Sequence, residues 1–211
     1  YHYPRSQKTI DQIKHSYKKF TKFYGKNVLK STNNYYAISK KNSLTSFDKY
    51  IKILKKNKLF YKKIINEKLF SNQIEGAIKS NEKTLNYFKI KKKITQLLKK
   101  YKIKIKFSAL VNKKMLKDFD KIIVCTYANN NQILKTLGVK PITKYRYELI
   151  EKIIIKLPPK FKNLSLVVLD GKFACLDPYL GSKYHLFSDV KHSKIEIINS
   201  KLPCFSNFKK K

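Results

Sequence analysis

The spacing of hydrophobic positions predicts an amphipathic helix near the start of the chain. Apolar residues recur there every three or four positions, as on one face of a helix. They are Ile10, Ile13, Tyr17, Phe20 and Tyr24. Thr9 and Gln12 have the spacing of a capping box, and Gly25 is a natural helix stop. We therefore expect a helix that ends before Gly25.

Three more segments have helical periodicity. Thr45 and Ser46 are expected to open a short helix whose apolar face holds Phe47, Tyr50, Ile51 and Leu54. Residues 86–102 form a lysine-studded amphipathic pattern, and residues 131–137 form a short one that ends at Gly138.

Strand patterns occur throughout and dominate the second half of the chain. The expected strands are 34–40, 74–80, 103–107, 120–126, 145–157, 165–171, 172–178 and 184–192. Residues 103–107 alternate strictly, which predicts a half-buried strand, whereas 120–126 are almost uninterruptedly apolar, as in a strand buried on both faces. Early helices followed by late, turn-separated strands predict an α+β fold with a largely antiparallel sheet and flanking helices.

Lysine dominates the charge of the chain, whose formal net charge is +36. This charge favours nucleic acid, so a lysine-rich RNA- or ribosome-associated binding protein is the alternative interpretation. Only Arg5 and Arg146 among the 49 basic residues are arginine, the residue that bidentate phosphate and guanine contacts favour. Lysine, asparagine, isoleucine, tyrosine and phenylalanine are enriched together. A bias toward AT-rich codons explains this without a specific nucleic-acid partner.

Cysteine and histidine spacing predicts no metal site. Cys125, Cys175 and Cys204 form no CxxC pair and no zinc-type cluster with the four histidines. Their wide spacing is typical of a reducing cytoplasm, where they would be small buried hydrophobic residues. No apolar run reaches the roughly 20 residues of a membrane span, and the sequence opens without a signal peptide. We therefore expect a cytoplasmic protein with no transmembrane segment.

Four polar segments are candidate ligand contacts, although no nucleotide-binding or hydrolase motif is present. The chain has no G-x-G-x-x-G, G-x-x-x-x-G-K, H-E-x-x-H or G-x-S-x-G, and only five glycines. The four segments are YHYPRS at 1–6, CTYANN at 125–130, LDGKF at 169–173 and DPY at 177–179. The last two are equally typical of an ordinary hairpin turn and an ordinary bend.

Several of these segments together resemble the FAD-dependent oxidoreductases of the D-amino-acid oxidase superfamily. YHYPRS, an amphipathic helix and NYYAISKKNSLTS follow one another as in that superfamily. IEGAIKSNEKTLNYFKIKKKITQLLKKYKIKIKF resembles its strand, helix and short strand, and FDKIIVCTYANNNQIL resembles its strand that ends over the cofactor. LSLVVLDGKFACLDPYLGSKYHLFSDVKHS resembles its late substrate-domain strands. The resemblance covers most of residues 1–195.

The resemblance implies an incomplete chain. The βαβ unit with G-x-G-x-x-G would precede Tyr1, which is not an initiator methionine, and the glycine-containing segment that closes over the flavin would follow Lys211. At the end of the strand, Tyr127 and Ala128 replace the usual glycine. The implied parts are a helix bordering the flavin side (1–30), two parts of a substrate domain (31–85 and 141–200), a helix and residual strands of an FAD-binding α/β domain (86–140) and a frayed basic tail (201–211).

The resemblance also implies an activity and its site residues. In this superfamily a flavin accepts hydride from a carbon that bears an amine or hydroxyl, so the substrate would be a small amino or hydroxy acid or a related metabolite. Thr126 and Tyr127 would border the FAD. The substrate side would be lined by His2, Tyr3, Arg5, Asp170, Phe173 and His185, with the Arg5 guanidinium able to bind an anionic group. Without the upstream pyrophosphate cradle, we expect this segment alone to be inactive and to retain no FAD.

Overall fold

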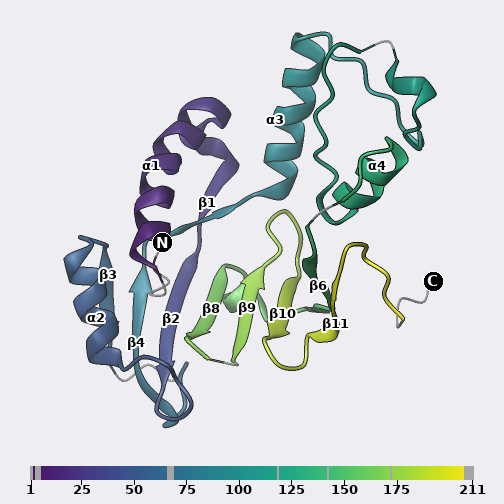
Figure 1. Ribbon diagram of the computed structural model, residues 1–211. Helices are drawn as coiled ribbons and strands as arrows, with labels where there is room; N and C mark the ends of the chain where they lie inside the picture. The colour runs from purple at the N-terminus through teal and green to yellow at the C-terminus, as the bar shows by residue number, and fades with distance from the viewer. Residues whose placement is uncertain are drawn as a thin grey trace. The chain divides into compact units, whose positions relative to one another are not determined.

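The computed structural model of the chain describes residues 2, 6–65, 69–117, 119–141, 143–171 and 173–206 (Figure 1). The chain divides into two compact units. Unit 1 comprises Tyr1–Lys102 and Lys152–His192, and unit 2 comprises Ile103–Glu151 and Ser193–Lys211.

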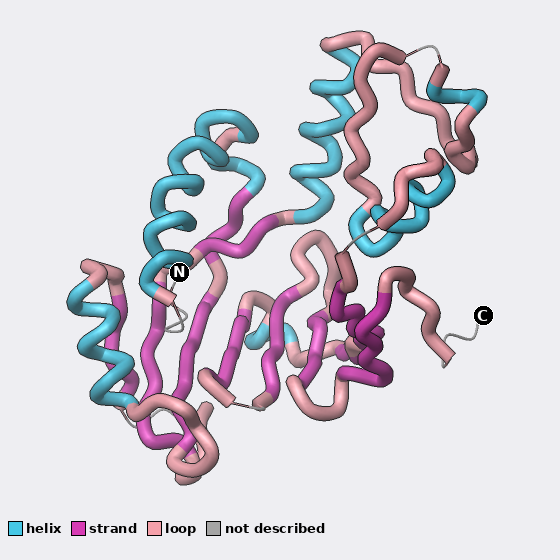
Figure 2. The backbone as a smooth tube through the Cα atoms, in the orientation of Figure 1, coloured by secondary structure: helices cyan, strands magenta, loops and turns pink. Residues whose placement is uncertain are grey.

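The framework of unit 1 is a mixed sheet, drawn in magenta in Figure 2. Within the described residues its strands lie in the order β3 (Tyr61–Ile64), β4 (Ile74–Ser80), β2 (Asn33–Ser39), β8 (Leu164–Leu169), β9 (Ala174–Pro178), β10 (His185–Asp189) and β7 (Ile153–Ile155). The β2–β8 pair is parallel and the other pairs are antiparallel. The expected α+β class with a mostly antiparallel sheet is thus confirmed. A separate antiparallel ribbon pairs β1 (Leu29–Ser31) with β5 (Lys83–Leu85).

The helices of unit 1 begin at polar caps. The Ser6 side chain accepts a hydrogen bond from the Thr9 amide, so α1 (Gln7–Tyr24) begins before the predicted capping box. Ser46 and Asn86 cap the other two helices in the same way. These are α2 (Phe47–Lys56) and α3 (Tyr87–Lys100), and the short helices of the unit are η1 (Lys26–Val28) and η4 (Pro159–Phe161). The helix predictions are confirmed to within a few residues.

The core of unit 1 lies between α2 and one face of the sheet. Buried side chains from both meet there: Ile38, Tyr50, Ile51, Leu54, Leu59, Ile78 and Leu169. Gly76 on β4 allows this approach, because a Cβ at that position would lie 2.5 Å from the Phe47 ring. Figure 1 shows α2 running alongside β3 and β4. The helix therefore defines an inner face of the sheet.

Unit 2 contains one antiparallel strand pair, β6 (Tyr145–Ile150) with β11 (Lys194–Ser200), among its described residues. Its helices are η2 (Lys114–Leu116), η3 (Tyr127–Asn129) and α4 (Asn130–Thr136), the last close to the prediction. The single strand expected over 145–157 was wrong. Its first part pairs with β11, which the pattern did not predict, and residues 153–155 join the large sheet of unit 1 as β7.

The strands expected at 103–107 and 120–126 do not form in this structure. Both segments lack regular secondary structure, and Figure 2 draws them as loop. Their apolar side chains are exposed: Ile103 by 53%, Ile105 by 50%, Phe107 by 82%, Ile122 by 47% and Ile123 by 86%. A strand needs a hydrogen-bonded neighbour, and these sequences have none within the described part of unit 2.

Two further expectations concern membrane spans and cysteines. Among the described residues, no helix has both the length and the apolar character needed to cross a bilayer. The expectation that the cysteines are buried was wrong for Cys125 and Cys204, which are exposed, while Cys175 is half-buried. All three are free thiols.

Candidate functional site

The inner face of the unit 1 sheet carries a row of polar side chains, which we call the polar track. Side chains that are directly paired, or two residues apart on one strand, share a face. In register, Tyr36 lies beside Val167, and Val167 beside Cys175, in the face that packs on α2. The polar residues on or against this face are His2, Tyr36, Glu82, Ser165, Cys175, Asp177 and Ser188.

His2 and Glu82 form the buried end of the polar track. The His2 side chain is fully buried, and its Nδ1 lies 3.1 Å from Glu82 Oε1. Its Nε2 lies 2.8 Å from the carbonyl oxygen of Phe60. Both ring nitrogens therefore lie close to oxygen atoms, one of a carboxylate and one of a backbone carbonyl. The Asn34 amide donates to the Glu82 carbonyl at 2.6 Å and fixes the backbone of this carboxylate.

Two tyrosines complete this end of the track. Tyr36 donates a short hydrogen bond to Glu82 Oε2, and its ring stacks on His2 with 5.8 Å between centroids. Tyr50 donates to the His2 carbonyl at 2.8 Å. Burial, reinforced by the Glu82 charge, raises the pKa of both phenols, so they stay neutral hydrogen-bond donors.

Glu82 stays ionised although it is largely buried. Burial alone would raise its pKa, but hydrogen bonds from His2 and Tyr36, together with the charge of His2, outweigh burial and hold the pKa well below its usual range. A carboxylate is therefore held in the track at all ordinary pH values.

The other end of the track lies on β8, β9 and β10 and is less buried. Ser165 donates to Asp177 Oδ1 at 2.7 Å, and Cys175 Sγ lies 3.1 Å from Ser188 Oγ. Asp177 and Cys175 are half-buried, whereas Ser165 and Ser188 are buried. Polar groups that are pre-oriented but still partly open to solvent are suited to contact a small polar ligand.

A second candidate site is a tyrosine-lined cavity in unit 2, which we call the tyrosine cavity. It has a volume of about 510 Å³. Its lining combines three tyrosines with an arginine and a glutamate: Tyr127, Ala128, Asn130, Tyr145, Arg146, Tyr147, Glu148, Ile150 and Phe205. The rings of Tyr145 and Tyr147, two residues apart on β6, lie 6.1 Å apart at 72°. Such a lining offers aromatic faces and one planar cation to a ligand.

Tyr127 is held in the cavity wall by an unusual backbone. Its φ is +55°, in the left-handed region that costs a non-glycine residue about 1–2 kcal/mol. The amide and hydroxyl of Thr126 both donate to Asn130 Oδ1, at 2.7 and 2.9 Å, and this fixes the turn. The Tyr127 side chain is nonetheless 93% exposed. Backbone strain of this kind is enriched at ligand-binding sites, which makes Tyr127 a candidate contact.

The charges at the tyrosine cavity are paired. Arg146 Nε lies 2.9 Å from Glu148 Oε1, and Lys194 Nζ lies 3.0 Å from Glu148 Oε2. The hydrogen bond from Lys194, aided by Arg146, lowers the pKa of Glu148. Within the lining Arg146 and Glu148 balance each other, and Lys194, which binds Glu148 from outside the lining, adds one positive charge nearby.

The structure separates the residues that the sequence analysis assigned to one substrate side. His2 lies in the polar track. Asp170, with a φ of +64°, and Phe173 lie at the turn between β8 and β9, where the Asp170 carbonyl accepts from the Leu44 amide at 2.7 Å. His185 pairs with Pro178, one residue out of step with Asp177, so it faces the opposite side of the sheet. Tyr3 and Arg5 lie outside the described residues.

His185 is buried to 98% at this position on the opposite face. Neither of its ring nitrogens has a hydrogen-bond partner among the described residues. Buried polar groups are normally paired, so His185 is an exception that a structural role alone does not explain.

The sequence analysis did not assign Glu82, Tyr36 or Ser165 to a site. One signal for Glu82 was available, because it is one of only 13 acidic residues and lies two positions after the end of a strand. Its partner His2 is 80 positions away, and such a pairing has no signature in local spacing.

Neither a metal centre nor a known relative narrows the choice between these sites. Among the described residues, no group of three histidine, cysteine, aspartate or glutamate side chains could hold a metal ion. The chain matches no protein-family model, no curated protein and no solved structure.

Proposed function

We propose that this chain is part of a cytoplasmic FAD-dependent oxidoreductase of the D-amino-acid oxidase type. Its reaction is the transfer of a hydride from a small amino or hydroxy acid, or a related metabolite, to the flavin. The observation that carries the proposal is the tyrosine cavity, because Tyr127, assigned to the cofactor from the sequence resemblance, lines it.

The chemistry of the tyrosine cavity fits part of FAD. Tyr127, Tyr145 and Tyr147 offer ring faces on which a planar heterocycle could stack, and Arg146 offers a guanidinium for a negatively charged group. FAD, when bound, supplies the hydride acceptor. The described chain has no glycine-rich loop to cradle the pyrophosphate, so these residues would hold only one portion of the cofactor.

The exposed apolar segments of unit 2 support the inference that a further domain covers them. Residues 103–107 and 120–126 have the alternating and continuous apolar patterns of sheet strands, yet their side chains are exposed. A nucleotide-binding domain with a parallel sheet would supply strand neighbours and bury these side chains.

The polar track is the proposed substrate side. His2, Tyr36 and Glu82 form a rigid, ionised anchor at its buried end. The half-buried Asp177 carboxylate, oriented by Ser165, could accept a hydrogen bond from a substrate amine or hydroxyl. Residues of the polar track would thus bind the substrate and orient the carbon that loses the hydride. The flavin, not these residues, would accept the electrons.

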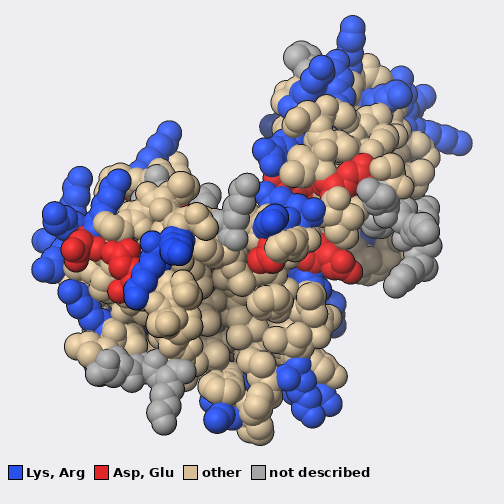
Figure 3. Space-filling model, turned by 90° about the horizontal axis from the view of Figure 1, so that it is seen from below, with Lys and Arg blue, Asp and Glu red and all other residues tan. Residues whose placement is uncertain are grey.

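The alternative, a lysine-rich RNA- or ribosome-associated protein, is not supported by a continuous basic surface on the face in Figure 3. Lysine and arginine side chains there form separate groups, interrupted by uncharged residues and by carboxylates. Phosphate-backbone binding favours a contiguous basic stripe.

The test begins with the reading frame that surrounds the coding region. We expect the upstream sequence to encode a strand, a G-x-G-x-x-G turn and a helix, and the chain extended in both directions to purify with one bound FAD, seen as flavin absorbance. Replacing both Tyr127 and Tyr145 by alanine should lower FAD retention in the extended protein. The matched control is Tyr101→Ala, since Tyr101 is an exposed tyrosine of unit 1.

Three outcomes would overturn the proposal. One is an upstream frame without the glycine-rich unit, and another is an extended protein that binds no flavin. The third is tight, steeply salt-dependent RNA binding by a flavin-free extended protein, which would favour the alternative. A stoichiometric flavin complex of the 211-residue chain alone would contradict the inference that the pyrophosphate cradle lies outside it.

A further inference from the structure

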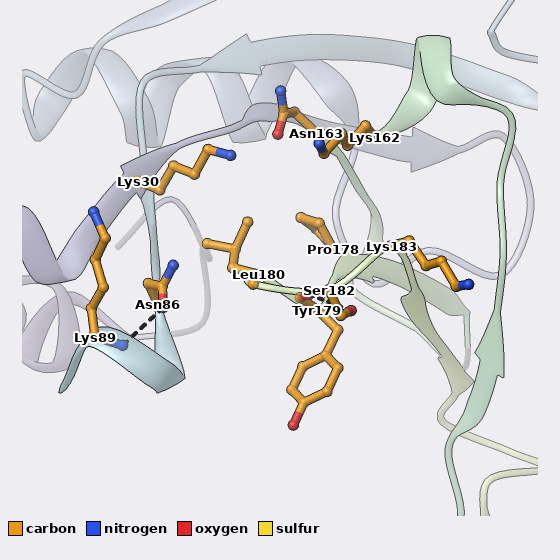
Figure 4. Close-up of a pocket in the computed structure, with 11 residues that line it drawn as sticks. Lys30, Asn86, Lys89, Lys162, Asn163, Pro178, Tyr179, Leu180, Ser182 and Lys183 are labelled. Carbon is orange, nitrogen blue, oxygen red and sulfur yellow. Dashed lines mark hydrogen bonds between the residues drawn. The ribbon is translucent and has the colours of Figure 1, made fainter. Parts of the chain in front are cut away.

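A third concave site lies in unit 1 and belongs to neither candidate site described above. It is a cavity of about 570 Å³, a volume typical of small-molecule pockets, which we call the lysine pocket (Figure 4). Four separate segments line it: β1, the start of α3, the η4–β8 junction and the β9–β10 turn. The lining residues are Lys30, Asn86, Lys89, Lys162, Asn163, Pro178, Tyr179, Leu180, Gly181, Ser182 and Lys183.

The walls of the lysine pocket are built by close packing. Phe88 on α3 presses on the β9–β10 turn at Gly181, where a Cβ would lie 2.4 Å from the ring. Gly181 has a φ of +97°, so both backbone conformation and space favour glycine there. The Phe88 and Tyr179 rings lie 5.8 Å apart. The helix start and the turn are therefore fixed against each other.

The lysine pocket is electropositive. Each of its four segments contributes one lysine, and its lining as described contains no aspartate or glutamate. Figure 4 shows Lys30 extending over the cavity toward Asn163, with Lys89 along the wall and Leu180 and Pro178 in the interior. The lysine pocket also takes in the N-terminal end of α3, where Asn86 caps the helix and the helix dipole adds positive potential.

The buried side chain of His185 lies next to Pro178, which lines the lysine pocket. His185 stands directly opposite Pro178 in the β9–β10 register, and cross-strand neighbours have Cβ atoms about 5 Å apart. Its ring nitrogens lack partners among the described residues. His185 does not itself line the lysine pocket, so its imidazole lies behind the wall that Pro178 forms.

We propose that the lysine pocket binds a small phosphorylated metabolite, with the phosphate held by Lys30 and Lys89 at the start of α3. Lysine is a common point-charge ligand for phosphate, and a helix N-terminus adds to that attraction. Pro178 and Leu180 would contact the carbon skeleton. The volume of about 570 Å³ is that of a small-molecule pocket, which favours a small molecule over a polynucleotide. This inference does not depend on the proposed flavin chemistry.

The test uses inorganic pyrophosphate as the probe and the 211-residue chain as the protein. Isothermal titration should show saturable binding of one pyrophosphate, and the double variant Lys30→Gln/Lys89→Gln should weaken it at least about tenfold. The matched control is Lys52→Gln/Lys56→Gln, which removes two exposed lysines from α2 and should change affinity less than about twofold. All four positions are exposed, so the variants are expected to fold.

The binding results that would overturn the lysine-pocket proposal differ from the results that would overturn the flavin proposal. Equal weakening by both double variants would show only nonspecific attraction of a polyanion to a polycation. Non-saturable pyrophosphate binding would show the same. A short single-stranded RNA that binds much more tightly than pyrophosphate, and loses affinity in the pocket variant, would identify the lysine pocket as part of a nucleic-acid surface instead.

Discussion

At the scale of single residues, the molecule is organised around one ionised carboxylate. Glu82 collects contacts from His2 and Tyr36, which are 80 and 46 positions away in sequence. A buried charge is costly unless it is paired and hydrogen-bonded, and removing one partner usually costs more than the pair contributes. Glu82 therefore links stability to pH.

We expect Glu82→Gln to lower the free energy of unfolding by about 2 kcal/mol at neutral pH. The folded-state pKa of Glu82 is lowered, so the stability it contributes is present above the ordinary glutamate pKa and is lost as pH falls toward the folded value. The difference between wild type and variant should shrink by about 1.8 kcal/mol between pH 7 and pH 3, because the slope is about 1.4 kcal/mol per pH unit below the ordinary value of about 4.3.

Urea unfolding at both pH values measures this difference. Glu151→Gln, at an exposed glutamate, is the control and should change stability by less than about 0.5 kcal/mol at either pH. A Glu82→Gln cost that stays the same at both pH values would contradict the assigned ionisation.

At the scale of elements, the packing of α2 on β4 depends on one glycine. Gly76 lies under the Phe47 ring and has no room for a side chain. The strand is also irregular at this point, since the β2–β4 register shifts between Ile38 and Ser39, opposite Gly76 and Ile74. The group that approaches Gly76 is the ring of Phe47, the first residue of α2.

Gly76→Ala is expected to destabilise the protein by about 2 kcal/mol, because the added methyl group overpacks the contact with Phe47. Chemical unfolding measures the change. In a Phe47→Leu background the same substitution should cost about 1 kcal/mol less, since a smaller side chain leaves space for the methyl group. Identical costs in both backgrounds would show that the strain arises elsewhere.

At the scale of the whole molecule, the two units differ in how well they bury their apolar sequence. Unit 1 has a continuous core under α2, whereas unit 2 exposes Ile105 and Ile123 by 50% and 86%. Exposed apolar patches mark surfaces that another chain segment or partner covers. In our proposal that covering is the nucleotide-binding domain.

Ile123→Gln should change the stability of the 211-residue chain by less than about 0.5 kcal/mol, because the side chain is 86% exposed, and Ile105→Gln, at a half-exposed position, by about 1 kcal/mol. In the chain extended with the expected glycine-rich unit, each should cost about 2 kcal/mol, since the side chains would then be buried. Thermal or chemical unfolding of both chain lengths measures this. The control is Ile197→Gln, at a position on β11 that is 44% exposed, which should have the same small effect on the stability of both chain lengths. Equal, small effects in the two chains would argue against a sheet that includes these segments.

Sequence by itself determined the features that depend on local physics. Helical periodicity and capping placed α1, α2, α3 and α4 to within a few residues, and alternation identified most strands of the large sheet. Part of the candidate site was also accessible, since His2 lies in the polar track and Tyr127 in the tyrosine cavity. Both residues were assigned from the family resemblance and not from periodicity, and the roles assigned to them stay predictions.

Tertiary structure alone decided which segments pair. The parallel β2–β8 contact joins strands more than 120 positions apart, His2 meets Glu82, and residues 145–157 divide between two units. Strand propensity at 103–107 and 120–126 was not enough, because a strand is completed by hydrogen bonds to a neighbour that the local sequence does not specify. Local sequence sets the preferences of a segment, and the energy of non-local burial and pairing decides whether those preferences are realised.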